Sequence, residues 1–134
     1  MTDEKQKVQK ALNDRAKFKS DFTDRSYRFG LKTIELVEKL DMKNISCRII
    51  GSQLIRSATS IGANIVEARG SSSKKDYANF FSHALKSANE TRYWISLLQG
   101  ARKIDQNKTD ELLQEVTELA NILAKSIMTM RGKS

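Results

Sequence analysis

The chain contains no proline and only six glycines among its 134 residues. Proline interrupts helices, and the turns between β-strands depend on glycine and proline. A compact β fold of this length needs more of both residues, whereas the strong helix formers Ala, Leu, Lys, Glu, Gln and Arg are plentiful here. We therefore expect one all-α domain, because a chain of this size has room for a single hydrophobic core.

Apolar residues recur at intervals of three and four positions in four segments, which predicts four helices. The first spans about residues 24–40 and the second about 45–69. The third begins near Ser73, whose hydroxyl can cap it, and the fourth follows a turn over residues 100–107. The four apolar stripes are Tyr27, Leu31, Ile34, Val37 and Leu40; Leu54, Ala58, Ile61, Ile65 and Ala68; Tyr77, Phe81, Ala84, Ala88, Ile95 and Leu98; and Leu112, Val116, Leu119, Leu123, Ile127 and Met130. Such stripes, joined by short connections, predict an antiparallel up-down-up-down four-helix bundle over residues 22–131.

Residues 1–21 differ from the rest of the chain. Val8, Leu12, Phe18 and Phe22 form only a thin apolar stripe among many charges. We interpret this part as an N-terminal extension, partly helical or disordered, that either prolongs the first helix or docks on a partner. Disorder is expected in its first few residues.

Positive charge is concentrated in the middle of the chain, whose net charge is +8. Residues 42–103 hold ten Lys and Arg against three Asp and Glu, whereas residues 1–41 hold ten against eight and residues 104–134 hold four against five. A surface with this bias attracts polyanions. RNA or DNA is the expected partner, ahead of an acidic membrane.

The expected compartment is the cytoplasm. No apolar run is long enough to cross a membrane, and the first 20 residues are charged where a secretory signal would be hydrophobic. Cys47 is the only cysteine, so no internal disulfide can form, and we interpret it as a small buried hydrophobe.

The residues that catalysis requires are nearly absent. One histidine, His83, and one cysteine, Cys47, supply neither a metal-ligand set nor a nucleophile–base pair. A Glu-x-x-His di-metal motif fails because Phe80 stands three residues before the histidine. The serine-rich stretch after Gly70 lacks the spacing of a nucleotide-binding loop. We expect no enzyme, no metal and no cofactor.

The second helix combines small residues with a few polar ones. Small residues crowd residues 51–63, which suits a close approach of another backbone. Arg56 and Glu67, eleven residues apart, point the same way but lie roughly 16 Å apart along the axis, so they cannot pair. Glu90 on the third helix is the candidate partner of Arg56. We interpret Arg56, Asn64, Glu67 and Glu90 as a structural polar network that fixes helix register, in preference to a ligand site.

The turn before the third helix is a stronger candidate for a ligand site than the polar residues of the second helix. Gly70 is expected to close the second helix in a left-handed conformation. The N-terminus of the next helix favours an anion, residues 71–73 supply serine hydroxyls, and Arg69, Lys74 and Lys75 add positive charge. The alternative is a solvated loop with lysines for solubility.

Two further pairs of residues lie on the third helix and after it. Arg102 and Lys103 lie in the next turn, at the opposite end of the bundle, and extend a basic surface only if an assembly uses both ends. Tyr93 and Trp94 are interpreted as core or interface aromatics, with base stacking as the alternative.

The segment from residue 52 to residue 98 resembles a known family. Its matching elements are Gln53-Leu-x-Arg56-Ser57, Ser60-Ile-x-Ala-Asn64-x-x-Glu67-Ala, Ser73-Lys74, Ala84-Leu85 and Ala88-Asn89-Glu90-Thr91-x-Tyr93-Trp94. In these elements the chain resembles the bacterial four-helix-bundle proteins that are also called 23S rRNA intervening-sequence proteins, and the resemblance runs from about Phe22 to Met130. It implies an antiparallel bundle that assembles as a homopentamer, without known catalytic residues. A related protein, the accessory variability determinant of diversity-generating retroelements, is a basic pentamer that binds nucleic acid and a reverse transcriptase.

Two functions follow as hypotheses. The first is a non-catalytic, homo-oligomeric bundle that binds RNA or other nucleic acid as an accessory factor of a ribonucleoprotein. The residues expected to contact phosphates are Arg69, Lys74, Lys75, Arg102 and Lys103. The second is a protein-interaction scaffold that recruits a partner such as a reverse transcriptase without binding nucleic acid itself.

Overall fold

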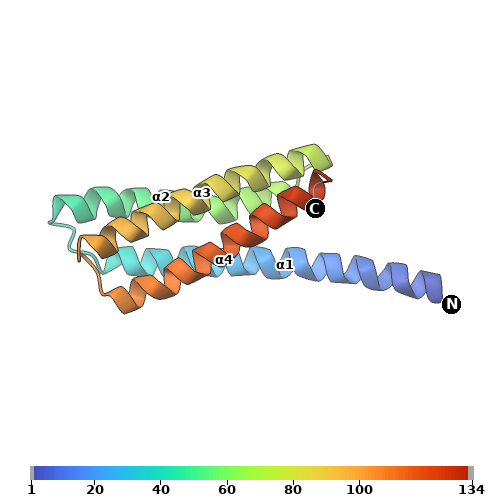
Figure 1. Cartoon of the computed structure of the whole chain (residues 1–134), viewed down its shortest axis with the longest axis horizontal. Coiled ribbons are helices and arrows are strands. Elements are labelled where there is room, and N and C mark those ends of the chain that lie inside the picture. The colour runs from blue at the N-terminus through green and yellow to red at the C-terminus, as the bar shows by residue number, and fades with distance from the viewer. Residues whose placement is uncertain (1, 133–134) are drawn as a thin grey trace.

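The computed structural model describes residues 2–132 and consists of four α-helices. They are α1 (Asp3–Glu38), α2 (Ile45–Arg69), α3 (Lys74–Gly100) and α4 (Gln106–Met130). Successive helices run in opposite directions (Figure 1), and each packs against two neighbours in the order α1, α2, α3, α4 and back to α1. The described residues contain no strand. The prediction of an all-α antiparallel four-helix bundle is confirmed.

Each helix begins at a residue whose side chain caps it. The four N-cap side chains accept a hydrogen bond from a backbone N–H group of the first turn, and they belong to Thr2, Asn44, Ser73 and Asp105. These residue types are the ones that helix N-termini favour, because their oxygens replace missing helical partners. The predicted cap at Ser73 is confirmed, with 3.1 Å between its Oγ and the backbone N of Asp76.

The predicted left-handed closure of α2 at Gly70 is wrong. Gly70 has φ −89° and ψ 0°, and its N–H group donates to the carbonyl oxygen of Glu67 at 3.1 Å. The helix therefore ends through a tightened last turn, which needs no positive φ. Among the described residues other than glycine, positive φ occurs at Arg102, after α3, with φ 56°.

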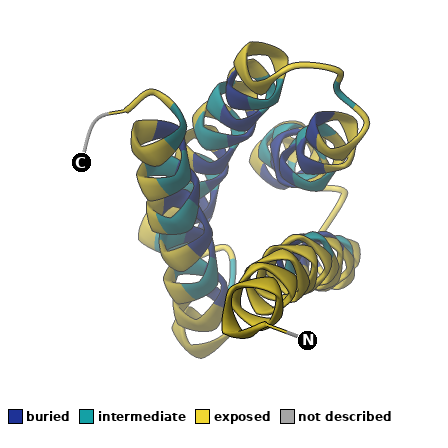
Figure 2. Ribbon diagram, turned by 90° about the vertical axis from the view of Figure 1, so that its right-hand side faces the viewer, coloured by how far each residue is buried: buried dark blue, intermediate teal, exposed yellow. Residues whose placement is uncertain are grey.

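The predicted apolar stripes of α2, α3 and α4 face the core. Ala58, Ile61, Ala88, Val116 and Leu123 are fully buried. At the ends of two stripes, Tyr77 and Met130 are only partly buried and pack against the core cluster. Figure 2 shows the buried faces of the helices turned towards one another.

The predicted stripe of α1 is partly wrong. Tyr27 and Leu31 are 63% and 43% exposed. The buried face of α1 contains two polar residues instead, Ser26 and Thr33, together with apolar residues such as Phe29. Each buried hydroxyl donates to a carbonyl oxygen four residues earlier at 2.9 Å, so neither side chain is left without a partner.

Residues 3–20 continue α1 beyond its buried part, which begins at Phe22. Figure 1 shows the N-terminal part of α1 projecting beyond the other three helices, and every residue from 3 to 20 is exposed (Figure 2). The N-terminal extension therefore prolongs the first helix, which is one of the two alternatives predicted for it. Disorder was expected for the first few residues; Met1 lies outside the described residues, and the helix begins at Asp3.

Polar contacts join α1 to α4. Arg25 donates from Nε and Nη2 to the two carboxylate oxygens of Glu115 at 2.8 and 2.7 Å, and it also contacts Glu118. Lys32 pairs with Glu111 at 3.1 Å. This contact between α1 and α4 is the least extensive of the four in the bundle.

Candidate functional site

A cleft of about 940 Å³ opens where α1 leaves the bundle. We call it the corner cleft, because its inner wall is the turn between α2 and α3. Its other walls are the extension of α1 and the C-terminal part of α4. The residues that line it are Asp14, Arg15, Phe18, Lys19, Ser71, Ser72, Ser73, Lys74, Tyr77, Phe81, Ile122, Lys125, Ser126, Thr129 and Met130.

Aromatic rings connect the walls of the corner cleft. Phe18 stacks on Phe22 with 5.8 Å between ring centroids, Phe22 meets Phe81 at 5.9 Å, and Phe81 meets Tyr77 at 4.8 Å. Phe22 and Phe81 are buried in the core, whereas Phe18 is 45% exposed and Tyr77 is half-buried. Burial raises the pKa of the Tyr77 hydroxyl, against the opposing influence of the nearby charge of Arg69. The cleft thus presents aromatic surface that rests on the core.

Positive side chains surround this aromatic surface. Arg15, Lys19, Lys74 and Lys125 line the cleft, against a single carboxylate, that of Asp14. Within residues 2–132, none of the four cations takes part in an ion pair. No ion pair among the described residues therefore neutralises their charge, and the opening attracts anions.

The turn between α2 and α3 is held by short polar contacts. Ser73 caps α3, and Ser71 donates its hydroxyl to the carbonyl oxygen of Ala68 at 2.6 Å. Arg69, at the end of α2, donates to the hydroxyl oxygen of Thr23 on α1 at 3.3 Å. These bonds fix the corner against α1, so that the wall of the cleft is positioned by the bundle itself.

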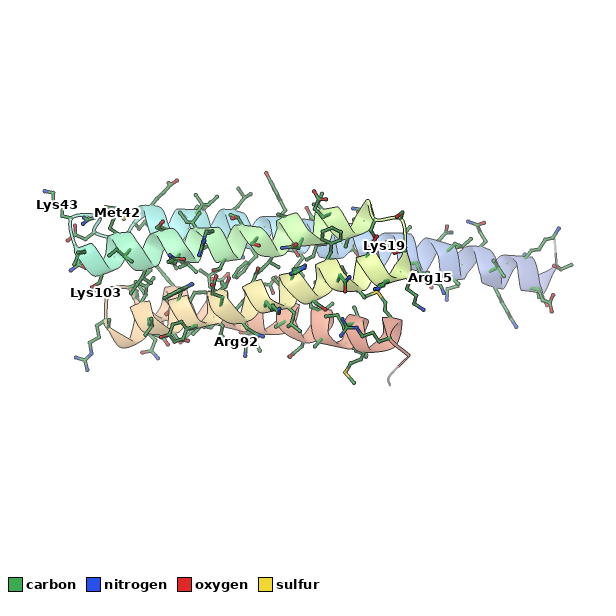
Figure 3. All side chains as sticks on the ribbon, turned by 90° about the horizontal axis from the view of Figure 1, so that it is seen from above. Arg15, Lys19, Met42, Lys43, Arg92 and Lys103 are labelled. Atoms are coloured by element: carbon green, nitrogen blue, oxygen red, sulfur yellow. The ribbon has the colours of Figure 1, made fainter. Side chains whose placement is uncertain are left out.

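The five basic residues predicted to contact phosphates do not form one site. Lys74 lines the corner cleft, while Arg69 and Lys75 are exposed at the same corner without lining it. Arg102 and Lys103 lie after α3, at the opposite end of the bundle. Figure 3 shows Lys103 at that end, and Arg15 and Lys19 where α1 leaves the bundle.

The opposite end differs from the corner in its charge. A cleft of about 440 Å³ there has basic and acidic side chains in near balance and no aromatic ring. Its charged residues are Lys32, Glu35, Lys39, Lys103, Asp105, Lys108 and Glu111. Lys32 and Glu111 already form an ion pair. The candidate site is therefore the corner cleft.

The predicted polar network of Arg56, Asn64, Glu67 and Glu90 is not formed within the chain. Arg56, Glu67 and Glu90 are exposed, and no ion pair among the described residues includes any of them. Arg56 donates to the side-chain oxygen of Gln53 at 2.7 Å, in place of the expected bond to Glu90. All three charged groups project from the outer face of their helices, where water competes with any pairing. A role between subunits stays a prediction.

Hydroxyl groups make the polar contact between α2 and α3 instead. Thr91 donates to Ser57 at 2.9 Å in the buried interface. Ser87 donates to Ser60 at 3.1 Å, while within α2 the amide nitrogen of Asn64 donates to the carbonyl oxygen of the same Ser60 at 2.9 Å. The small residues of α2 thus allow the close approach that their size predicted.

The other residues singled out from the sequence have structural positions. Cys47 is buried, at 2% exposure, as expected. His83 is exposed, and residues 2–132 contain no group of three or more His, Cys, Asp or Glu that could hold a metal ion. Trp94 packs against the core, whereas Tyr93 is 57% exposed with its ring edge-on to Trp94, so Tyr93 is not a core residue and its place in an interface stays a prediction. In the same part of the chain, no helix combines the length and apolar character that crossing a membrane requires.

The prediction from the sequence did not include four residues of the corner cleft, because they lie far from the serine-rich turn in the sequence. Arg15, Phe18 and Lys19 belong to the N-terminal extension, and Lys125 belongs to the last helix. One signal was available: Arg15 and Lys19 are four residues apart and Phe18 and Phe22 are also four apart, so on a continuous helix each pair lies on one face.

Comparisons with known proteins bear on the whole bundle. The model of the 23S rRNA-intervening sequence protein family matches residues 19–125. A solved structure of a protein of unknown function from Bacteroides thetaiotaomicron, described as belonging to the S23 ribosomal protein family, is 34% identical with a TM-score of 0.74. The match covers 79% of this chain and 97% of that chain. Comparison with curated proteins gave no significant match. On the family match over most of its length, the chain belongs to the 23S rRNA-intervening sequence protein family.

Proposed function

We propose that this protein is a non-catalytic, cytoplasmic accessory factor of a ribonucleoprotein and that it binds RNA at the corner cleft. The observation that carries the proposal is the group of four cations around the cleft that have no carboxylate partner among the described residues. The family description, which refers to 23S rRNA, supports RNA as the nucleic acid to test first.

The phosphate contacts divide into two groups. Arg15, Lys19 and Lys74 line the cleft and contact a strand that enters it. Arg69 and Lys75, exposed at the same corner, contact phosphates on either side. Each contact releases condensed counterions from the nucleic acid, so affinity should fall steeply with salt.

We also propose that the protein is a homo-oligomer, with a homopentamer as the expected form. Support comes from the exposed apolar face of α1, where Tyr27 and Leu31 border a groove of about 190 Å³ against Gly62 and Ala63 of α2. A second copy packed on this face removes its apolar surface from water. Arg102 and Lys103 add to the RNA-binding surface only in an assembly that brings both ends of the bundle to one ligand. Light scattering tests this assembly, and a monomer at micromolar concentration contradicts it.

Charge reversal at the corner tests RNA binding. The double variant Lys74→Glu and Lys75→Glu should weaken binding of a fluorescently labelled structured RNA by at least about tenfold at low salt, because it turns two attractive charges into repulsive ones. Lys86→Glu with Lys108→Glu is the matched control, since both lysines are exposed and lie outside the corner cleft. Equal affinities of the two double variants contradict the proposed site.

The protein-interaction scaffold is the competing outcome of the same experiment. If the wild-type protein binds no nucleic acid even at low salt, RNA binding is ruled out. The recruitment of a protein partner, such as a reverse transcriptase, then becomes the working hypothesis.

A further inference from the structure

The corner cleft combines two features that a site for phosphate alone does not need together. Its rim is basic, and its inner surface carries two aromatic rings, that of Phe18, which is exposed, and that of Tyr77, which is half-buried. Phosphate groups require only the cations. A ligand that also uses the aromatic surface must have a flat apolar face in addition to its negative charge.

We infer that the corner cleft takes an unpaired nucleotide, with its base against Phe18 and Tyr77 and its phosphates on Arg15, Lys19 and Lys74, so that the preferred ligand is single-stranded RNA. This inference rests on the proposed function. A duplex hides both faces of its bases within the stack, whereas a single strand offers them to aromatic side chains.

The aromatic surface is backed firmly enough to receive a base. Phe18 lies parallel to Phe22, with 10° between the ring planes, and Phe22 is buried against Phe81. Tyr77 also packs on Phe81, with 4.8 Å between the ring centroids. A base that stacks here adds to a row of rings already anchored in the core, so little side-chain freedom is lost on binding.

The charges are placed for a strand that crosses the opening. Lys19 holds its ammonium nitrogen 5.3 Å from the centroid of the Tyr77 ring, so a cation and a stacking surface lie together. Lys74 approaches from α3 and Lys125 from α4. The cleft volume of about 940 Å³ lies at the upper end of the range of roughly 300–1,000 Å³ found for ligand pockets.

An acidic amphipathic helix is the competing ligand, because it also brings apolar surface and negative charge. The hydroxyl groups of Ser72, Ser126 and Thr129 favour the nucleotide. Base edges carry several hydrogen-bond donors and acceptors, whereas the apolar face of a helix carries none.

The test compares a short single-stranded RNA with a blunt duplex of the same sequence by fluorescence anisotropy. Phe18→Ala should weaken single-strand binding by about 5- to 100-fold, the loss expected for one stacked base, and leave duplex binding unchanged. Phe18→Tyr should retain the affinity of the wild type. Leu12→Ala is the matched control, because Leu12 is an exposed apolar residue of the same helix that does not line the cleft. A 2-aminopurine base in the single strand should lose fluorescence on binding to the wild type and keep it with Phe18→Ala.

The outcomes separate this inference from the proposed function. If Lys74→Gln weakens single-strand binding while Phe18→Ala has no effect and 2-aminopurine is not quenched, base stacking is refuted and RNA binding stands. If neither RNA binds at low salt, both proposals fail. If neither RNA binds but an acidic amphipathic peptide does, and Phe18→Ala releases it, the cleft is a protein-binding groove and the inference is overturned.

Discussion

Lys19 on α1 lies with its ammonium nitrogen 5.3 Å from the centroid of the Tyr77 ring on α3. The contact joins the base of the N-terminal extension to the corner between α2 and α3. The family match begins at residue 19, so Arg15 and Phe18 lie just outside it while lining the same cleft. The corner cleft is thus built from the common bundle and from a segment outside the family match.

Removal of residues 2–18 should separate these two contributions. The bundle should remain folded, because the side chains of this segment are exposed and α1 has its buried contacts from Phe22 onwards. RNA affinity should fall, since the cleft loses Arg15 and Phe18. Circular dichroism and RNA titration of the shortened chain check the two statements. Full affinity in the shortened chain would show that the extension takes no part in the site.

Arg102→Gly should stabilise the protein by about 0.5–1 kcal/mol. Arg102 has φ 56° after α3, where its N–H group donates to the carbonyl oxygen of Gln99 and that of Lys103 donates to Leu98. Glycine adopts this left-handed conformation without the steric cost that a side chain imposes. Urea unfolding measures the change. Arg102→Ala is the control, because it removes the charge and keeps the strain, and an equal gain there would assign the effect to charge.

Two glycines inside helices should respond differently to alanine. A Cβ atom at Gly30 meets nothing within 4 Å, whereas at Gly51 it lies 3.1 Å from Leu40 and 3.2 Å from Val37. Gly30→Ala should therefore gain about 0.5–1 kcal/mol of stability from helix propensity. In Gly51→Ala the crowding should offset that gain. Thermal and urea unfolding of the two variants provide the comparison, and equal gains would contradict the close packing at Gly51.

Acid should weaken the link between α1 and α4. The hydrogen bonds from Arg25 hold the pKa of the Glu115 carboxyl below its usual value, against the opposing effect of burial. Because this pKa is lower in the folded than in the unfolded state, the ionised carboxylate stabilises the fold at pH values above about 4.3, the pKa of an unfolded-state glutamate. The stabilisation is lost as the pH falls through the folded-state pKa.

Glu115→Gln should therefore lower the free energy of unfolding at neutral pH by about 1 kcal/mol, because the pair is bidentate and partly buried. It should also flatten the decline of stability below about pH 4.3. Glu38→Gln is the control, since Glu38 is exposed and, within residues 2–132, lies in no ion pair. Urea unfolding at several pH values measures both effects, and parallel curves for wild type and Glu115→Gln would contradict the assignment.

The helices could be predicted from the sequence where the buried positions are apolar. In α2, Leu54, Ala58 and Ile61 all face the core, so the spacing of apolar residues located the buried face correctly. In α1 the buried face includes Ser26 and Thr33, whose hydroxyls bond to their own helix. A prediction from residue type alone therefore placed Tyr27 on the buried face of α1, whereas Tyr27 is exposed.

The corner cleft could be predicted only in part. Ser73 and Lys74 are neighbours in the sequence, and the helix start between them has a recognisable signature. The contribution of Arg15 and Lys125 depends on how α1 continues past α4, and this is a property of the packed bundle. The spacing of residues within one segment carries no information about it.

The salt dependence of RNA binding tests the central claim most directly. The logarithm of the association constant of single-stranded RNA is plotted against the logarithm of salt concentration for the wild type and for Arg15→Gln with Lys74→Gln. Each lost phosphate contact should reduce the slope by about 0.7, so the double variant should show a slope smaller by about 1.4 and a weaker affinity. An unchanged slope, with the variant folded, would contradict RNA binding at the corner cleft.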